Sequence, residues 1–226
     1  MVDGKHTEIQ DGRTALARAV VYRVLARCFS HPDQELIELF GSARLEEFLQ
    51  SWRYLGLESS ENIARAAKWV AKSPSQEAAL PELEKEYTRL FITAYPKVVA
   101  PPYSSVYLDK EWLVWGRGTA EVARLYDAAG LRMNQDFHDI PDHIAAEFEF
   151  ASYLISERLR DRDNGIRIGE LAQIEKDFLG GHLLRWSPVF LSRVAESSRI
   201  AFYQAAANLG REFLAWETES LEEAQH

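Results

Sequence analysis

The amino-acid sequence predicts an all-α fold, a single compact bundle of about ten helices with one long proline-rich connecting loop. Along most of the 226 residues, apolar side chains recur at spacings of three and four, the period of one face of an α-helix. No segment alternates apolar and polar residues for long, so strands are not expected. The composition is 46% apolar and includes 6 Trp, 9 Tyr and 11 Phe, enough to form a packed core.

Helices account for most of the first 95 residues. Apolar residues from Leu16 to Cys28 recur every four positions and predict the first helix. Pro32 favours the start of the second, and Gly56 is a suitable C-terminal cap for the third. The helix that contains Leu90 is expected to end at Tyr95, because the residue before a proline is disfavoured in the α conformation. The expected ranges are 14–29, 32–40, 45–55, 60–70 and 80–94.

The middle of the chain is expected to be irregular. Residues 96–103 contain three prolines and predict a stiff, extended loop, and the aromatic-rich segment 104–115 follows it. Thr119 caps a helix that Gly130 ends, and residues 131–140 form a second connection that could act as a hinge. Ile140-Pro141-Asp142 begins a long helix that runs to about Arg162. Three more helices are expected at 167–179, 181–196 and 198–217, before an acidic tail that frays from Glu217.

Charge and cysteine content exclude several classes of function. The chain has 26 basic and 35 acidic residues, and a net charge of −9 argues against nucleic-acid binding and suits a basic partner such as an Arg-rich peptide. A single cysteine, Cys28, allows no internal disulfide and no Cys-rich metal site. The N-terminus is polar and no apolar run approaches the length of a membrane span, so we expect a cytoplasmic protein without stable membrane insertion.

Enzyme motifs are mostly missing. There is no Gly-x-Ser-x-Gly turn, no phosphate-binding loop and no His-Glu-x-x-His, and no cofactor is expected. Gly116-Arg117-Gly118 lacks a third glycine and a preceding strand, which favours a simple helix start. One alternative stays open. A metal-dependent helical hydrolase could use His143 and Glu147, which share a helix face, together with His138 and Asp142.

Two carboxylates near residue 140 allow both a structural and a functional interpretation. Glu147 falls on a core-facing stripe with Ile144 and Phe148, where a carboxylate must be hydrogen-bonded or paired. It either accepts backbone N–H groups from a neighbouring loop or lines a groove and binds an arginine of a ligand. Asp142 lies in the first turn of its helix, where the helix dipole favours a carboxylate without any further role.

Three sequence segments occur in an informative order: EYTRLF at 86–91, APPYSSVYLD at 100–109, and IPDH at 140–143, which opens the helix that contains Glu147. Together they resemble the TorD/DmsD/NarJ family of redox-enzyme maturation chaperones, closest to its TorD and DmsD branch, over at least residues 80–160. HLLRW at 182–186 is similar to a late helix of the family. One departure is Ile140, because the family often has an acidic residue just before the proline, and here the nearest is Asp139.

The resemblance implies an all-helical cytoplasmic protein without catalytic activity. Such a chaperone binds the twin-arginine leader, and parts of the body, of the precursor of a molybdenum-cofactor enzyme subunit until cofactor insertion and assembly or export. Two alternatives remain: the NarJ-like mode, in which the client is not exported, and a purely structural interaction protein. The chain is expected to be a monomer or a domain-swapped dimer. With Glu147 added, the implied peptide-binding residues are Tyr87, Leu90, Phe91, Pro102, Tyr103, Ser105, Tyr107, Gly116, Asp142, His143 and Glu147.

The chemistry of such a leader predicts the character of its site. A basic front and an apolar middle require carboxylates beside an apolar groove, and each hydrogen bond to a charged group contributes about 1.5–3 kcal/mol. The groove is expected where residues 96–109 meet the start of the helix at 141, with Pro101 and Pro102 keeping its wall rigid. The candidate carboxylates are Asp136, Asp139, Asp142, Glu147 and Glu149, and the candidate aromatic residues are Tyr103, Tyr107, Trp112 and Trp115.

Overall fold

The computed structural model describes residues 2–40, 42–58, 60–72, 76–109, 117–131, 140–161 and 164–223. These residues form eleven α-helices and two short π-helices, so the predicted all-α class is confirmed. The β pairing among them is a single isolated bridge between Tyr103 and His143. Among the described residues, we find no helix with the length and apolar character needed to cross a bilayer.

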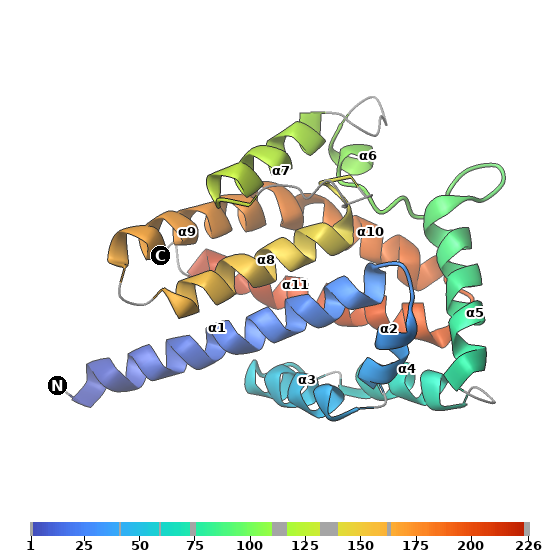
Figure 1. Ribbon diagram of the computed structural model, residues 1–226, viewed down its shortest axis with the longest axis horizontal. Coiled ribbons are helices and arrows are strands. Elements are labelled where there is room, and N and C mark those ends of the chain that lie inside the picture. The colour runs from blue at the N-terminus through green and yellow to red at the C-terminus, as the bar shows by residue number, and fades with distance from the viewer. Residues whose placement is uncertain are drawn as a thin grey trace.

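Three long helices run through the middle of the molecule: α1 (Val2–Phe29), α8 (Ile144–Arg160) and α11 (Ala201–Glu223) (Figure 1). They meet through aromatic rings, with the ring centroid of Tyr22 4.8 Å from that of Phe213 and 6.0 Å from that of Phe148. The four-residue repeat from Leu16 to Cys28 is buried as predicted except at its first member, since Leu16 is 56% exposed.

The first third of the chain wraps one side of this centre. It comprises α2 (Gln34–Phe40), α3 (Ala43–Tyr54), α4 (Ser60–Lys72) and α5 (Gln76–Tyr87), with α3 packed on α1 and α4 on α11. Gly56 has a φ of 72° just after α3, and Gly130 has a φ of 84° just after α7 (Arg117–Ala128). Glycine adopts this left-handed conformation most easily, which explains why both helices end where the sequence predicts.

The other side is built from α6 (Ser105–Leu108), α7, α9 (Gly165–Phe178) and α10 (Leu184–Ser197). Helix α9 packs on α8, and α10 packs on α11. At Gly210 of α11 the side chain of Leu191 from α10 packs directly on the glycine, because a Cβ there would lie 2.9 Å from a methyl carbon of Leu191.

Two segments have π-helical turns where the sequence predicts ordinary helix or a break. The π-helix η1 (Thr88–Ile92) continues α5, and η2 (Leu179–Leu183) joins α9 to α10 through the pair Gly180-Gly181. The predicted division at these glycines is therefore wrong, because they continue a helical path. Single π-helical turns within helices are frequent at functional sites, and here they contain Leu90, Phe91 and His182.

The predictions for three irregular segments have different outcomes. Fraying from Glu217 is wrong, because α11 continues to Glu223 and the Glu217 side chain is 1% exposed and paired with Arg18. The segment 96–103 is non-helical, as predicted. Most of the expected hinge, residues 132–139, lies outside the described residues.

Candidate functional site

The proline-rich loop and the start of α8 lie against each other, as the sequence predicts. The amide of Ile144 donates to the carbonyl of Pro102 at 2.8 Å, and the amide of Ser104 donates to the carbonyl of Asp142 at 3.0 Å. The rings of Tyr103 and His143 are 5.3 Å apart between centroids. This junction brings Pro102 and Tyr103 from one segment beside Asp142 and His143 from the other.

Asp142 is an internal residue of this junction and not part of a charged rim. Its side chain is 0% exposed, and Oδ2 accepts a hydrogen bond of 2.9 Å from the amide of Ser105. His143 is also buried, and its Nδ1 accepts from the amide of Ala145 at the start of α8. Both side chains hold the loop and the helix together, so the predicted negative rim does not form at Asp142.

Glu147 has neither of the partners that the sequence analysis considered. It is 0% exposed; the Nε2 of His182 lies 2.7 Å from Oε1, and the indole N–H of Trp186 donates to Oε2 at 2.9 Å. Burial raises the pKa of Glu147. Burial alone would lower the pKa of His182, but the charge of Glu147 and the hydrogen bond to it outweigh burial and raise it. The carboxylate therefore fastens α8 to η2 and α10 and does not face a groove.

Several other predicted site residues also lie in the core. Tyr87, Leu90 and Phe91 are 5%, 0% and 4% exposed, and the ring of Phe91 contacts Phe190 at 5.8 Å between centroids. Pro102 and Ser105 are buried as well, whereas Tyr103 and Tyr107 are half-buried and Glu149 is exposed. The remaining candidates lie outside the described residues: Trp112, Trp115, Gly116, Asp136, His138 and Asp139.

Exposed apolar side chains lie next to these buried residues. Ile92 is 56% exposed, Tyr95 is 100% exposed and Val189 is 49% exposed. We call these three residues the η1–α10 patch, because contacts between Phe91 and Phe190 hold their two segments together. The sequence analysis did not select them, although Ile92 directly follows the motif residue Phe91.

Tyr107, one of the predicted aromatic residues, packs against α10, the helix that contains Val189. Its ring lies 5.3 Å from that of Trp186 and 6.4 Å from that of Phe190, between centroids. The guanidinium carbon of Arg193 lies 4.9 Å from the centre of the Tyr107 ring. The face of Tyr107 thus already contacts a guanidinium in the free protein.

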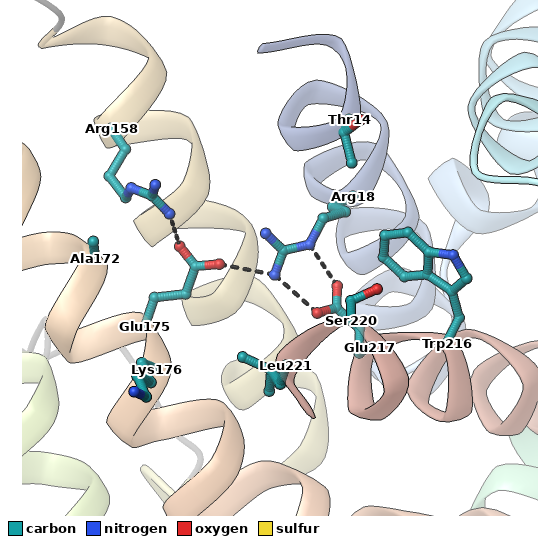
Figure 2. A pocket seen from close by; sticks show the side chains of 10 residues that line it. All are labelled: Thr14, Arg18, Arg158, Ala172, Glu175, Lys176, Trp216, Glu217, Ser220 and Leu221. Carbon is teal, nitrogen blue, oxygen red and sulfur yellow. Dashed lines mark hydrogen bonds and ion pairs between the residues drawn. The ribbon is translucent and has the colours of Figure 1, made fainter. Parts of the chain in front are cut away.

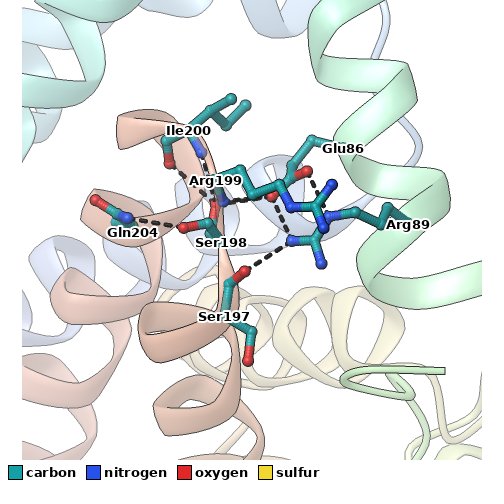
Figure 3. Close-up of polar contacts among 7 residues, drawn as sticks. All are labelled: Glu86, Arg89, Ser197, Ser198, Arg199, Ile200 and Gln204. Carbon is teal, nitrogen blue, oxygen red and sulfur yellow. Dashed lines mark hydrogen bonds and ion pairs between the residues drawn. The ribbon is translucent and has the colours of Figure 1, made fainter. Parts of the chain in front are cut away.

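A polar cluster fixes η1 against the turn between α10 and α11 (Figure 3). Arg89 donates two hydrogen bonds to Glu86, at 2.8 and 2.7 Å, and a third to the carbonyl of Ser197 at 2.7 Å. Glu86 also accepts from the amide of Arg199 at 2.6 Å. Burial raises the pKa of Glu86, but these hydrogen bonds outweigh it and bring the pKa below its usual value.

The lowered pKa of Glu86 predicts a specific loss of stability in acid. Its contribution to the free energy of unfolding is complete above the ordinary pKa of 4.5 and is lost as the pH falls through the lower folded value. Glu86→Gln should therefore be less stable than wild type at neutral pH and converge with it in acid. Urea unfolding between about pH 3 and pH 7 tests this, with Glu82→Gln, an exposed position on α5, as the control. Parallel pH profiles for wild type and Glu86→Gln would contradict it.

The predicted metal cluster is not found in the part of the chain that the structure describes. Among these residues, no three His, Cys, Asp or Glu side chains are placed to hold a metal ion. Both oxygens of Glu147 have protein partners, and His138 lies outside the described residues.

Comparisons with known proteins agree with this fold and these motifs. The family model described as the nitrate reductase delta subunit matches residues 56–192. A chaperone protein TorD of Vibrio cholerae is 27% identical over 212 residues, which is 91% of this chain and 92% of that protein. Another, from Photobacterium profundum, is 30% identical over 135 residues, 60% of this chain and 62% of that protein.

A solved structure, described as a redox enzyme maturation protein from Archaeoglobus fulgidus, matches with a TM-score of 0.51 and 26% identity. The match covers 87% of this chain and 93% of that chain. The relatives are chaperones by name, in agreement with the prediction that the chain is not an enzyme. Because the family model covers more than half of the sequence, the chain belongs to the nitrate reductase delta subunit family and is a maturation chaperone of redox enzymes.

Proposed function

We propose that this chain is a cytoplasmic chaperone that binds the twin-arginine leader of one molybdenum-cofactor enzyme precursor. It holds the precursor until the cofactor is inserted and the subunit is assembled or exported. The family supports the chaperone role, and the η1–α10 patch is the observation that carries the leader-binding role. Exposed Ile92, Tyr95 and Val189 lie beside the segments that the family resemblance indicates.

The apolar middle of the leader fits the η1–α10 patch. Ile92, Tyr95 and Val189 leave apolar surface in water that a bound peptide would cover. The chain neighbours of Ile92 and Val189, Phe91 and Phe190, are buried and pack against each other, so little order has to be gained in these segments on binding. Full burial of one such side chain contributes about 1.5–3 kcal/mol.

The basic front of the leader fits exposed carboxylates on α7 and α9. Glu121 and Asp177 line a surface pocket of about 260 Å³ with His182 and Gly181 of η2. Arg124 also lines this pocket, and its Nε donates to the carbonyl of Ala120 within its own helix. From Gly181 to Val189 the chain rises about 12 Å along the helix axis, a distance that about four extended peptide residues span.

In this proposal the buried motif residues shape the site and do not contact the leader. Asp142 and His143 fix the proline-rich loop to α8, and Glu147 fixes α8 to the helix pair that presents His182 and Val189. Tyr107 then lies between the loop and α10, against Trp186.

Binding of a synthetic leader peptide, measured by calorimetry, tests the proposal. The twin-arginine leader of a molybdenum-cofactor enzyme precursor from the same organism should bind, and replacing both of its arginines with glutamine should weaken binding. Ile92→Ser with Tyr95→Ser should weaken binding by about tenfold or more, since it removes the surface that the apolar middle covers. Ile166→Ser is the matched control, because Ile166 is 79% exposed on α9.

Three outcomes separate the possibilities. Equal affinities for the double serine variant and the Ile166→Ser control would rule out the η1–α10 patch. Equal affinities for the arginine and glutamine leaders would rule out recognition of the twin arginine. Binding of the precursor's body without its leader would indicate the NarJ-like mode instead.

A further inference from the structure

A second cavity lies far along α11 from the η1–α10 patch, where the end of that helix meets α1, α8 and α9 (Figure 2). Its volume is about 360 Å³, within the size range of small-ligand sites. Trp216 and Leu221 supply most of the apolar lining, and each of the four helices contributes at least one charged side chain.

The carboxylates of this cavity are already bound by arginines of the chain. Arg18 donates to both oxygens of Glu217, at 2.7 and 2.8 Å, and lies 2.8 Å from Oε1 of Glu175. Arg158 lies 2.5 Å from Oε2 of Glu175. Each of the four carboxylate oxygens therefore has a guanidinium partner.

The cavity retains unused hydrogen-bond donors. The Nε of Arg158 is buried and has no partner in the described part of the chain, which is an unfavourable state for a donor. Lys176 adds a third cation to the lining, and no ion pair connects it to another described residue.

We propose that this cavity binds a carboxylate carried on an apolar body of about the size of one amino-acid residue. Three cations and two carboxylates line it, so its formal charge is positive although the whole chain carries −9. The unpartnered Nε of Arg158 and the excess of cations suit a carboxylate, and Trp216 and Leu221 suit the apolar body. An Arg-rich leader has the opposite charge, so this site is independent of leader binding.

N-acetyl-leucine and its uncharged analogue N-acetyl-leucinamide test the charge requirement, since they differ only at the carboxylate. The acid should bind the full chain at least about tenfold more tightly than the amide, measured by ligand-observed NMR. Arg158→Gln should weaken binding of the acid by about tenfold. Arg160→Gln is the matched control, because Arg160 lies on the same helix with a side chain that is 74% exposed.

Circular dichroism of both variants verifies that they are folded before binding is compared. If Arg158→Gln does not fold, Lys176→Gln, at an exposed position, provides a second test. Equal binding of acid and amide, binding of neither, or equal effects of Arg158→Gln and Arg160→Gln would overturn the proposal. An acetylated tetrapeptide that ends in a free leucine distinguishes the sources of the carboxylate. Binding as tight as that of N-acetyl-leucine supports a peptide C-terminus, and binding of N-acetyl-leucine alone supports a free small acid.

Discussion

Arg18→Met is expected to lower the free energy of unfolding by about 3–5 kcal/mol, because it leaves the buried carboxylate of Glu217 without its guanidinium partner and Glu175 with Arg158 alone. The side chains of Glu217 and Glu175 are 1% and 6% exposed, so both carboxylates depend mainly on hydrogen bonds from the protein. A typical domain is stable by about 5–15 kcal/mol, and this single change would remove a large part of that. Urea unfolding followed by circular dichroism measures the effect.

Two further variants show whether the buried charge is the cause. Arg160→Met removes an exposed arginine and should change stability by no more than about 0.5 kcal/mol. Arg18→Met combined with Glu217→Leu should recover much of the loss, since replacing a whole buried ion pair with apolar residues is often tolerated. A loss below about 1 kcal/mol in Arg18→Met alone would contradict the assigned role of this network.

Glu147→Leu is expected to destabilise the protein by about 2–6 kcal/mol, because two buried donors lose their acceptor and each loss costs about 1–3 kcal/mol. These donors are ring N–H groups of His182 and Trp186, 2% and 1% exposed. Urea unfolding at neutral pH measures the difference from wild type.

The controls separate the hydrogen bonds of Glu147 from its charge and from any contact with the leader. Glu149→Leu, at an exposed position two residues along α8, should be nearly neutral. Glu147→Gln retains an acceptor and should be less harmful than Glu147→Leu. If it is folded, it should bind the leader peptide as wild type does, since Glu147 is 0% exposed. Wild-type stability of Glu147→Leu would contradict the structural role.

Local patterns in the sequence were sufficient to predict most of the helices and the ends at Gly56 and Gly130, but not the start of α1 at Val2, the start of α8 at Ile144 or the end of α11 at Glu223. The period of the apolar residues reports which face of a helix turns inward, and Gly56, Gly130 and the prolines before Tyr103 act within a few residues of the chain. For the same reason the family motifs located the junction between the loop and α8, where Tyr103 pairs with His143.

The partners of the buried charges depended on tertiary structure. Glu147 is bound by side chains 35 and 39 residues away, and Arg18 by one 199 residues away. A helical pattern places a carboxylate on an inward face but does not reveal the donor that faces it, so Glu147 and Asp142 resembled ligand-binding residues. The same long-range pairing keeps α11 helical past Glu217.

The sequence alone determined the helical class, the irregular middle and the motifs that mark the family, because each depends on residues close together in the chain. The folded molecule decided which motif residues reach solvent, since packing of distant helices buries Leu90 and Phe91 and leaves Ile92 and Tyr95 exposed.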